Sequence, residues 1–425
     1  MLAPPLCVST RCRKVDDHER FLYLPLFREP RYYDASLAFS DMLVLRGGTI
    51  VDAGGSRAGD VAIADDRIYE VGDVSVEPER EIDVSGSYLT PGLIDCHVHL
   101  GMDGRPVVSS HRLENTFEPA YRTVDNLRGA LESGVTTVRD LGGWGTHAID
   151  AARAVETETI VGPRVVPSGE AITMTGGHGH WFGREADGPD EVRTAAREQL
   201  KNGAEVIKCI ATGGVLTTGT TTGAPELTKR ELEAAVDVAR SKNVPTAAHA
   251  HGREGILNAV EAGFSSIEHG TYMDRHAAQA MAENGTYWVP TANALYGIAD
   301  AGPESDIPPD AIDKADAARE PFVDAFEYAL EADVPIAMGT DAGTPNNYFA
   351  DIPTELERLV EHGLTPKEAL DAATIDAAHL LGFTDLGRIE SGYLADFLVL
   401  PDDPLEDVSA WQRPQAIFKN GCQIK

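Results

Sequence analysis

The stretch Pro91-Gly-Leu-Ile-Asp-Cys-His97-Val-His99 contains the clearest structural signal of the chain. An apolar run that follows Pro-Gly and ends in polar residues is typical of a buried strand in a sheet whose two faces are both covered. Positions i and i+2 of a strand face the same side, so we expect His97 and His99 to point together from the end of this strand. Two imidazoles at that spacing are placed to share one metal ion.

The chain beyond this strand alternates short β-type runs with amphipathic helices. The alternation over residues 91–385 predicts an α/β fold of the (β/α)₈ TIM-barrel type, in which functional residues follow the carboxyl ends of the strands. A doubly wound open sheet is the alternative, and the eight candidate strands and their polar ends weigh against it. The candidate strands are 93–100, 136–141, 164–168, 206–211, 246–250, 266–269, 288–290 and 336–339, and the candidate helices are 119–133, 189–202, 227–242, 253–263, 273–284, 311–332 and 351–362.

Both ends of the chain have a different pattern. Residues 42–90 and 386–425 consist of short β-type runs that turn residues separate. Together they predict one small β-sandwich domain formed from both ends of the chain. Residues 1–41 carry 6 basic and 6 acidic residues and show no periodicity. They are either a targeting or oligomerisation arm or an extension that precedes the true first residue, Met42.

The composition excludes several classes of protein. The 425 residues carry a net charge of −32, with 9 Lys among the 36 basic residues, so a nucleic-acid partner would be repelled. No apolar run of 18 residues or more occurs, so a membrane span is not expected. The acidity indicates either attraction of cationic substrates or a surface adapted to a salt-rich, halophilic cytoplasm. Five scattered cysteines suit a reducing compartment, and we expect a cytoplasmic protein.

Further metal-ligand types end other predicted strands. Lys208 lies inside an apolar run, where an amine is costly unless it is paired or neutralised. It is either a carbamate, formed with carbon dioxide, that bridges two metals, or a lysine whose amine reaches the rim. His249, His269 and Asp341 follow the fifth, sixth and eighth strands. Imidazole and carboxylate ligands suit Zn²⁺ or Mn²⁺.

These motifs resemble the amidohydrolase superfamily over residues 43–425. Within it the chain is most similar to imidazolonepropionase-related enzymes and to prolidase-like dipeptidases and carboxypeptidases. Imidazolonepropionases themselves resemble a one-metal version without the lysine, so Lys208 moves the chain away from them. The motifs that carry the resemblance are Pro91–His99, Thr136-Thr-Val-Arg-Asp-Leu-Gly-Gly143, Val206-Ile-Lys208, His249-Ala-His251, Ile267-Glu-His269-Gly and Gly339-Thr-Asp341.

The resemblance implies a centre of two divalent metal ions, with zinc expected and manganese as the alternative. His97, His99 and Asp341 would hold the first metal, while His249 and His269 would hold the second. Carboxylated Lys208 would bridge the two ions. Two metals lower the pKa of a shared water and polarise a carbonyl. Asp341 would accept the proton of that water and deliver it to the leaving nitrogen.

The substrate contacts are harder to predict. The glycine-rich loop Thr173–His180 offers His178, which either contacts a substrate oxygen or faces solvent. His251 shares the strand face of His249. Arg139 either forms an internal salt bridge with Asp140 or binds a substrate carboxylate, and Tyr272 is a candidate contact at the rim.

The pattern therefore favours a metal-dependent amidohydrolase. We expect it to cleave an amide bond of a small molecule or dipeptide, most simply a dipeptide or C-terminal peptide bond of the Xaa-Pro type. Hydrolysis of a cyclic amide or N-acyl compound is the second hypothesis, and a metal-binding scaffold without catalysis is the third. A homo-oligomer is compatible with the sequence.

Overall fold

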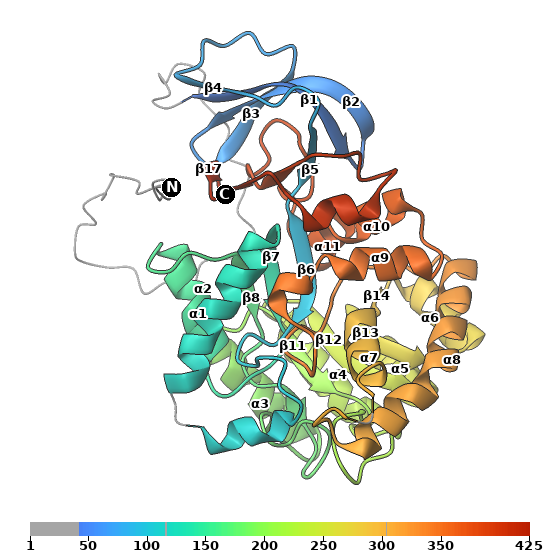
Figure 1. The fold of residues 1–425 in the computed structure, drawn as a ribbon. Helices are drawn as coiled ribbons and strands as arrows, with labels where there is room; N and C mark the ends of the chain where they lie inside the picture. Colours follow the sequence, from blue (N-terminus) through green and yellow to red (C-terminus); the bar gives the residue numbers. More distant parts are fainter. Residues whose placement is uncertain (1–41, 115–116, 303) are drawn as a thin grey trace, which may run out of the picture.

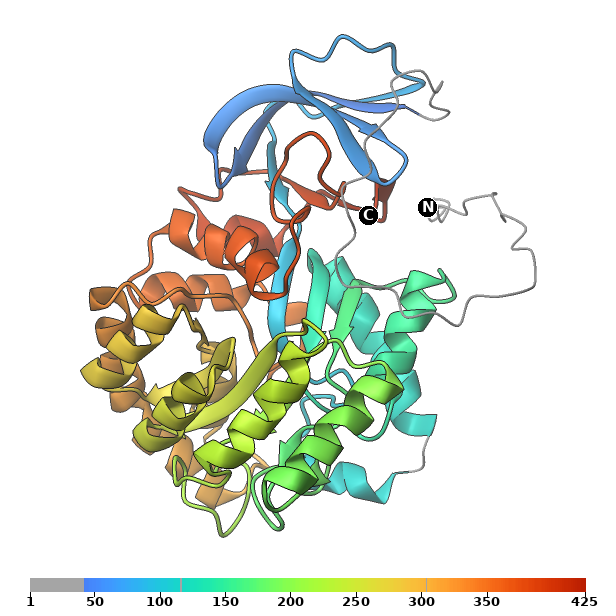
Figure 2. The same ribbon diagram turned by 180° about the vertical axis from the view of Figure 1, so that it is seen from behind.

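The computed structural model describes residues 42–425 apart from 115, 116 and 303. The expected extension, residues 1–41, lies outside the described residues. A β-rich part formed by both ends of the chain lies at one end of a larger part in which helices surround parallel strands (Figures 1 and 2). Within the described ranges, no helix combines the length and the apolar character that crossing a bilayer demands.

The β-rich part contains one mixed sheet of eight strands. Its order is β17-β16-β15-β5-β1-β2-β3, with β4 paired to β1. Strands from both ends of the chain meet where β5 pairs with β15. The strands are β1 (Leu43–Asp52), β2 (Gly55–Ala64), β3 (Arg67–Gly72), β4 (Arg80–Asp83), β5 (Tyr88–Pro91), β15 (Phe397–Leu400), β16 (Ala416–Lys419) and β17 (Cys422–Gln423).

The larger part contains two parallel sheets. One has the order β6-β7-β8 and the other the order β10-β9-β11-β12-β13-β14. Seven of the expected strands occur here, and β9 and β10 are short additions that the sequence did not signal. The strands are β6 (Leu93–Val98), β7 (Val135–Asp140), β8 (Arg164–Pro167), β9 (Ile172–Thr173), β10 (Arg184–Glu185), β11 (Ile207–Ile210), β12 (Thr246–Gly252), β13 (Ser266–Tyr272) and β14 (Tyr287–Val289).

The eighth expected strand, 336–339, is not a regular strand. Its backbone nevertheless bridges the two sheets, because Trp288 pairs with Ile336 and Val98 with Ala342, both in parallel. A second link connects the two sheets: the Glu205 amide donates to the Pro167 carbonyl at 2.8 Å, which joins the end of β8 to the segment just before β11. The result is a mixed α/β fold with a curled sheet.

Helices cover the outside of the curled sheet (Figure 1). All seven expected helices are present, and capping boxes form at Thr228 and at Thr365. The sequence did not signal α2, α7 and α11. The helices are α1 (Phe117–Glu132), α2 (His147–Glu156), α3 (Pro189–Asn202), α4 (Lys229–Arg240), α5 (Arg253–Ala262), α6 (Arg275–Asn284), α7 (Ala292–Ala299), α8 (Pro309–Glu331), α9 (Thr354–Glu361), α10 (Pro366–Ala372) and α11 (Ile375–Leu380), with short 3₁₀ turns η1 (Val108–Leu113), η2 (Phe349–Asp351) and η3 (Val408–Gln412).

Candidate metal centre

The end of β6 brings together the first group of donors. His97 and His99 are buried, and their Nε2 atoms lie 3.4 and 3.1 Å from Asp341 Oδ1. His97 Nδ1 donates to Glu268 at 2.9 Å, and His99 Nδ1 donates to the Gly142 carbonyl at 2.7 Å. These three side chains place one ligand atom each within 4.8 Å of one another, as expected for a shared ion.

The geometry of His97 leaves a pair of acceptors facing each other. Burial lowers the pKa of His97 to about 4, so its ring is neutral near pH 7. Since its Nδ1–H is directed at the Glu268 carboxylate, its Nε2 presents a lone pair to the Asp341 carboxylate. A cation between Nε2 and the carboxylate oxygen would satisfy both acceptors. The donor set therefore fits a divalent metal.

A second group of donors comes from β12 and β13. His249, His251 and His269 are buried and also place one ligand atom each within 4.8 Å of one another. His269 Nδ1 lies 2.8 Å from Thr291 Oγ1, whose own hydrogen is donated to the Pro290 carbonyl. The threonine oxygen therefore accepts from Nδ1–H, which leaves His269 Nε2 free to bind a metal.

The imidazoles of the cavity differ in the direction in which their pKa values are shifted. Burial holds the pKa of His249 and of His269 well below the ordinary value and lowers that of His251 to about 4. Neutral imidazole is the form that binds metals. His99 is the exception, because the contact with Asp341 outweighs burial and raises its pKa.

Lys208 lies in the same cavity as both groups of donors. It is 2% exposed, and its Nζ has no hydrogen-bond partner among the described residues. Burial lowers the pKa of this amine to about 8. The neutral amine is therefore more accessible than in a free lysine, and among the described side chains Nζ lacks the hydrogen-bond partner that a buried amine requires.

Glu268 and Arg139 support the donors from behind. Arg139 is fully buried, and its guanidinium pairs with Glu268 at 3.0 Å. The Arg139 charge and the His97 contact outweigh burial and lower the pKa of Glu268 to about 2, so this carboxylate is ionised. The expected pair of Arg139 with Asp140 was wrong, because adjacent residues of a strand face opposite sides. Asp140 instead accepts the amides of Leu100 and Gly142.

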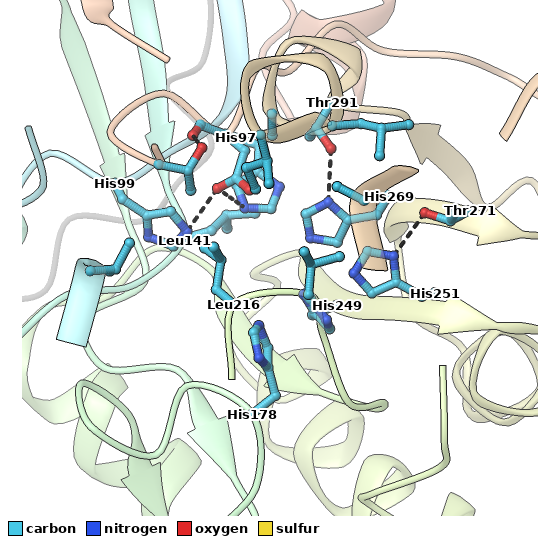
Figure 3. A pocket seen from close by; sticks show the side chains of 18 of the residues that line it. His97, His99, Leu141, His178, Leu216, His249, His251, His269, Thr271 and Thr291 are labelled. Atoms are coloured by element: carbon cyan, nitrogen blue, oxygen red, sulfur yellow. Dashed lines mark hydrogen bonds and ion pairs between the residues drawn. The ribbon is translucent and has the colours of Figure 1, made fainter. Parts of the chain in front are cut away.

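Two of the four residues that we expect to contact the substrate line the cavity, and the other two do not. His178 and His251 line the cavity, whereas Arg139 and Tyr272 are not among its lining residues. His178 Nδ1 lies 2.7 Å from Thr217 Oγ1, and its ring centroid is 4.4 Å from that of His249. Figure 3 shows His178 on the opposite side of the cavity from His97.

Several residues that position the donors were not predicted from the sequence. Glu226 accepts the His178 amide with both of its oxygens, at 2.8 and 3.0 Å, and so fixes the loop that carries this histidine. Thr291 accepts a hydrogen bond from His269, and Thr271 Oγ1 is hydrogen-bonded to His251 Nδ1 at 2.8 Å. A buried acid next to a ligand, as in Ile267-Glu-His269, is the signal that could have identified Glu268.

Three residues of the site adopt backbone conformations that side chains rarely take. The φ angles of His269, Thr291 and Asp341 are 69°, 57° and 61°. In this left-handed region a Cβ atom is crowded by its own backbone. At His269 the irregular backbone interrupts the alternation of β13, so that Glu268 and His269 both reach the interior.

Comparison with known proteins agrees with this geometry. Residues 88–423 match the model of the amidohydrolase family. Ochratoxinase of Aspergillus niger is 32% identical over 432 residues, which cover 92% of this chain and 88% of that protein. Imidazolonepropionase of Ectopseudomonas mendocina (strain ymp) is 27% identical, over 79% of this chain and 84% of its own length. A crystal structure of a Xaa-Pro dipeptidase with methionine bound in the active site superposes with a TM-score of 0.85 at 32% identity, covering 91% of this chain and all of that chain. The chain belongs to the amidohydrolase family.

Proposed function

We propose that this chain is a metal-dependent hydrolase that cleaves an amide bond of a dipeptide or an N-acyl amino acid. One observation carries the proposal: two groups of three donors and an unpartnered lysine amine line one buried cavity. The relatives named ochratoxinase and Xaa-Pro dipeptidase support amide chemistry at such a site.

The donors would divide between two divalent ions, zinc or manganese. His97, His99 and Asp341 would hold the first ion, and His249 and His269 the second. Lys208 would bridge them as a carbamate: its neutral amine adds to carbon dioxide, an N–C bond forms, and one proton is released. The unpartnered Lys208 Nζ supports this assignment. When bound, the two ions would supply an activated water and a polarised carbonyl.

The remaining steps belong to side chains of the cavity. Asp341 would accept a proton from the attacking water and transfer it to the departing nitrogen. The Thr217 hydroxyl can donate to His178 Nδ1, so that His178 Nε2–H points to the cavity and donates to the substrate carbonyl or carboxylate oxygen. His251, which Thr271 orients, would contact the substrate from the other side.

The proposal extends to the architecture of the chain, a closed barrel with a separate small β-domain. The bridges of residues 336 and 342 to β14 and β6 support a closed (β/α)₈ barrel over residues 91–385. The sheet shared by both chain ends supports a separate small β-sandwich domain over residues 42–90 and 386–425. In a barrel of this kind, the strand ends that carry the donors would form the catalytic mouth.

A substrate screen tests the function. Protein loaded with zinc or manganese would be assayed by metal analysis and against dipeptides, N-acyl amino acids and cyclic amides. We expect about two metals per chain and cleavage of the linear amides. Preferential cleavage of cyclic amides would replace this proposal with an imidazolonepropionase-like activity. Metal binding without cleavage of any amide would leave only a scaffold.

A further inference from the structure

The cavity that holds the donors continues into a part without polar side chains, which we name the apolar arm. Its walls are apolar side chains from three segments: the loop after β11, α7 and α8. The residues that define the apolar arm are Leu216, Leu295, Ile298, Ala315, Ala318 and Phe322.

The spacing of residues on α8 builds one wall. Ala315, Ala318 and Phe322 recur at intervals of three and four, so they share one face of the helix. The two alanines are at most 1% exposed, and their small side chains leave space between α8 and the facing helix α7. A larger residue at either position would project into that space.

The opposite wall is tied to the donors. Leu216 packs against the hydrophobic cluster to which Ile298 and Ala315 belong. The next residue, Thr217, accepts a hydrogen bond from Lys314 of α8 at its carbonyl, at 3.1 Å, and contacts His178 through its hydroxyl at 2.7 Å. A group bound in the apolar arm therefore lies beside the histidine that we assign to the substrate.

The charges of the cavity are confined to the donor end. Among the described residues that line it, Lys208 and Asp341 are the charged side chains apart from the histidines. A charged group in the apolar arm would lose its water and find no partner, which is costly. A methylene group placed there gains about 0.8 kcal/mol from leaving water.

We infer that the substrate is an amide that carries an uncharged, extended apolar group, which binds in the apolar arm beside the reacting carbon. The inference rests on the proposed amide hydrolysis and specifies its substrate class. Linear acyl and alkyl chains are the first probes, because their length can be increased by one methylene group at a time.

Two series of substrates test the inference with the metal-loaded protein. In one, the acyl group of an N-acyl amino acid lengthens from acetyl to octanoyl. In the other, the acyl group stays acetyl and the amino-acid side chain lengthens from alanine to norleucine. In at least one series, kcat/KM should rise roughly three- to fourfold per methylene until the arm is full. A chain of equal length ending in a carboxylate should be at least about tenfold poorer.

Variants locate the effect in the structure. Ala318→Phe should abolish the dependence of kcat/KM on chain length, because the added ring occupies the arm. Val323→Phe on the exposed side of the same helix is the matched control, since Val323 is 50% exposed. If Ala318→Phe does not fold, Leu216→Ala carries the test, and it should reduce kcat/KM most for the longest chains.

The outcomes separate the two proposals. Equal rates for short and long chains in both series would overturn the apolar arm as the specificity site and leave amide hydrolysis standing. Failure to cleave any linear amide would overturn the proposed function itself. A chain-length dependence that Ala318→Phe and Val323→Phe reduce equally would also overturn the location in the arm.

Discussion

The two ends of the cavity are built on opposite principles. At the donor end, five of the six histidines are fixed by a hydrogen bond at Nδ1. In the apolar arm, Leu216, Ile298 and Phe322 come from a loop and two helices and offer only hydrocarbon. Directional hydrogen bonds fix the positions of reacting atoms. Apolar surface instead contributes binding free energy in proportion to the apolar area that is buried against it. Reaction and substrate preference should therefore respond to different substitutions.

The largest expected effect is at the donor end. Asp341→Asn should lower kcat by about 10²- to 10⁴-fold because the amide cannot accept the proton. The decrease should be the same for short and long substrates, since the arm is untouched. Steady-state kinetics would measure it, with circular dichroism to show that the fold is kept. Asp125→Asn, at an exposed site on α1, is the control. A near-normal rate in Asp341→Asn would exclude this residue as the base.

Removal of the metals should abolish the activity, and zinc or manganese should restore it. Lys208→Met should retain about one metal per chain or fewer, because the proposed bridge is lost. Elemental analysis of the purified variant would measure this, with Lys201→Met on α3 as the exposed control. Two metals in Lys208→Met would show that the lysine is not a ligand.

A supporting residue should have an intermediate effect. Glu268→Gln should weaken metal binding about 10- to 100-fold, because the acceptor that orients His97 is altered. It should also lower the free energy of unfolding by about 3 kcal/mol, since Arg139 loses its buried partner. Metal titration and denaturant unfolding would measure the two effects, with exposed Glu254→Gln on α5 as control. Unchanged metal affinity would assign Glu268 a purely structural role.

Thr217→Val tests the point where the two regions meet. Loss of one hydrogen bond to His178 should lower kcat/KM about tenfold. The slope of activity against chain length should stay the same, because Leu216 keeps its place. If the slope falls and the rate with acetyl substrates does not, the loop serves the arm rather than His178.

The smallest effect is expected outside the cavity. Tyr272 lies at the end of β13, half-buried, and is not among the cavity-lining residues. Tyr272→Phe should therefore leave kcat/KM within about twofold for every chain length. A loss above about fivefold would place its hydroxyl in the substrate site.

The sequence predicts the donor end far better than the arm. His97 and His99 follow from strand alternation, and Lys208 stands out as an amine in an apolar run. Glu268 could not be placed by alternation, since the left-handed backbone at His269 lets the adjacent residues Glu268 and His269 both reach the interior. Helix α7 was not predicted because it is short and mostly apolar. It is also preceded by Thr291, whose backbone is left-handed, and not by a regular helix cap. The apolar arm is lined by residues that are far apart in the sequence, from 216 to 322. No local sequence pattern predicts that such distant residues lie together.

The left-handed backbone at His269, Thr291 and Asp341 has an evolutionary consequence. A side chain in that conformation costs on the order of 1–2 kcal/mol, and glycine would relieve the crowding. Yet glycine at these positions would discard two proposed ligands and the threonine that orients one of them. Selection of variants for thermal stability alone would thus favour glycine at these positions and yield more stable proteins that no longer turn over substrate.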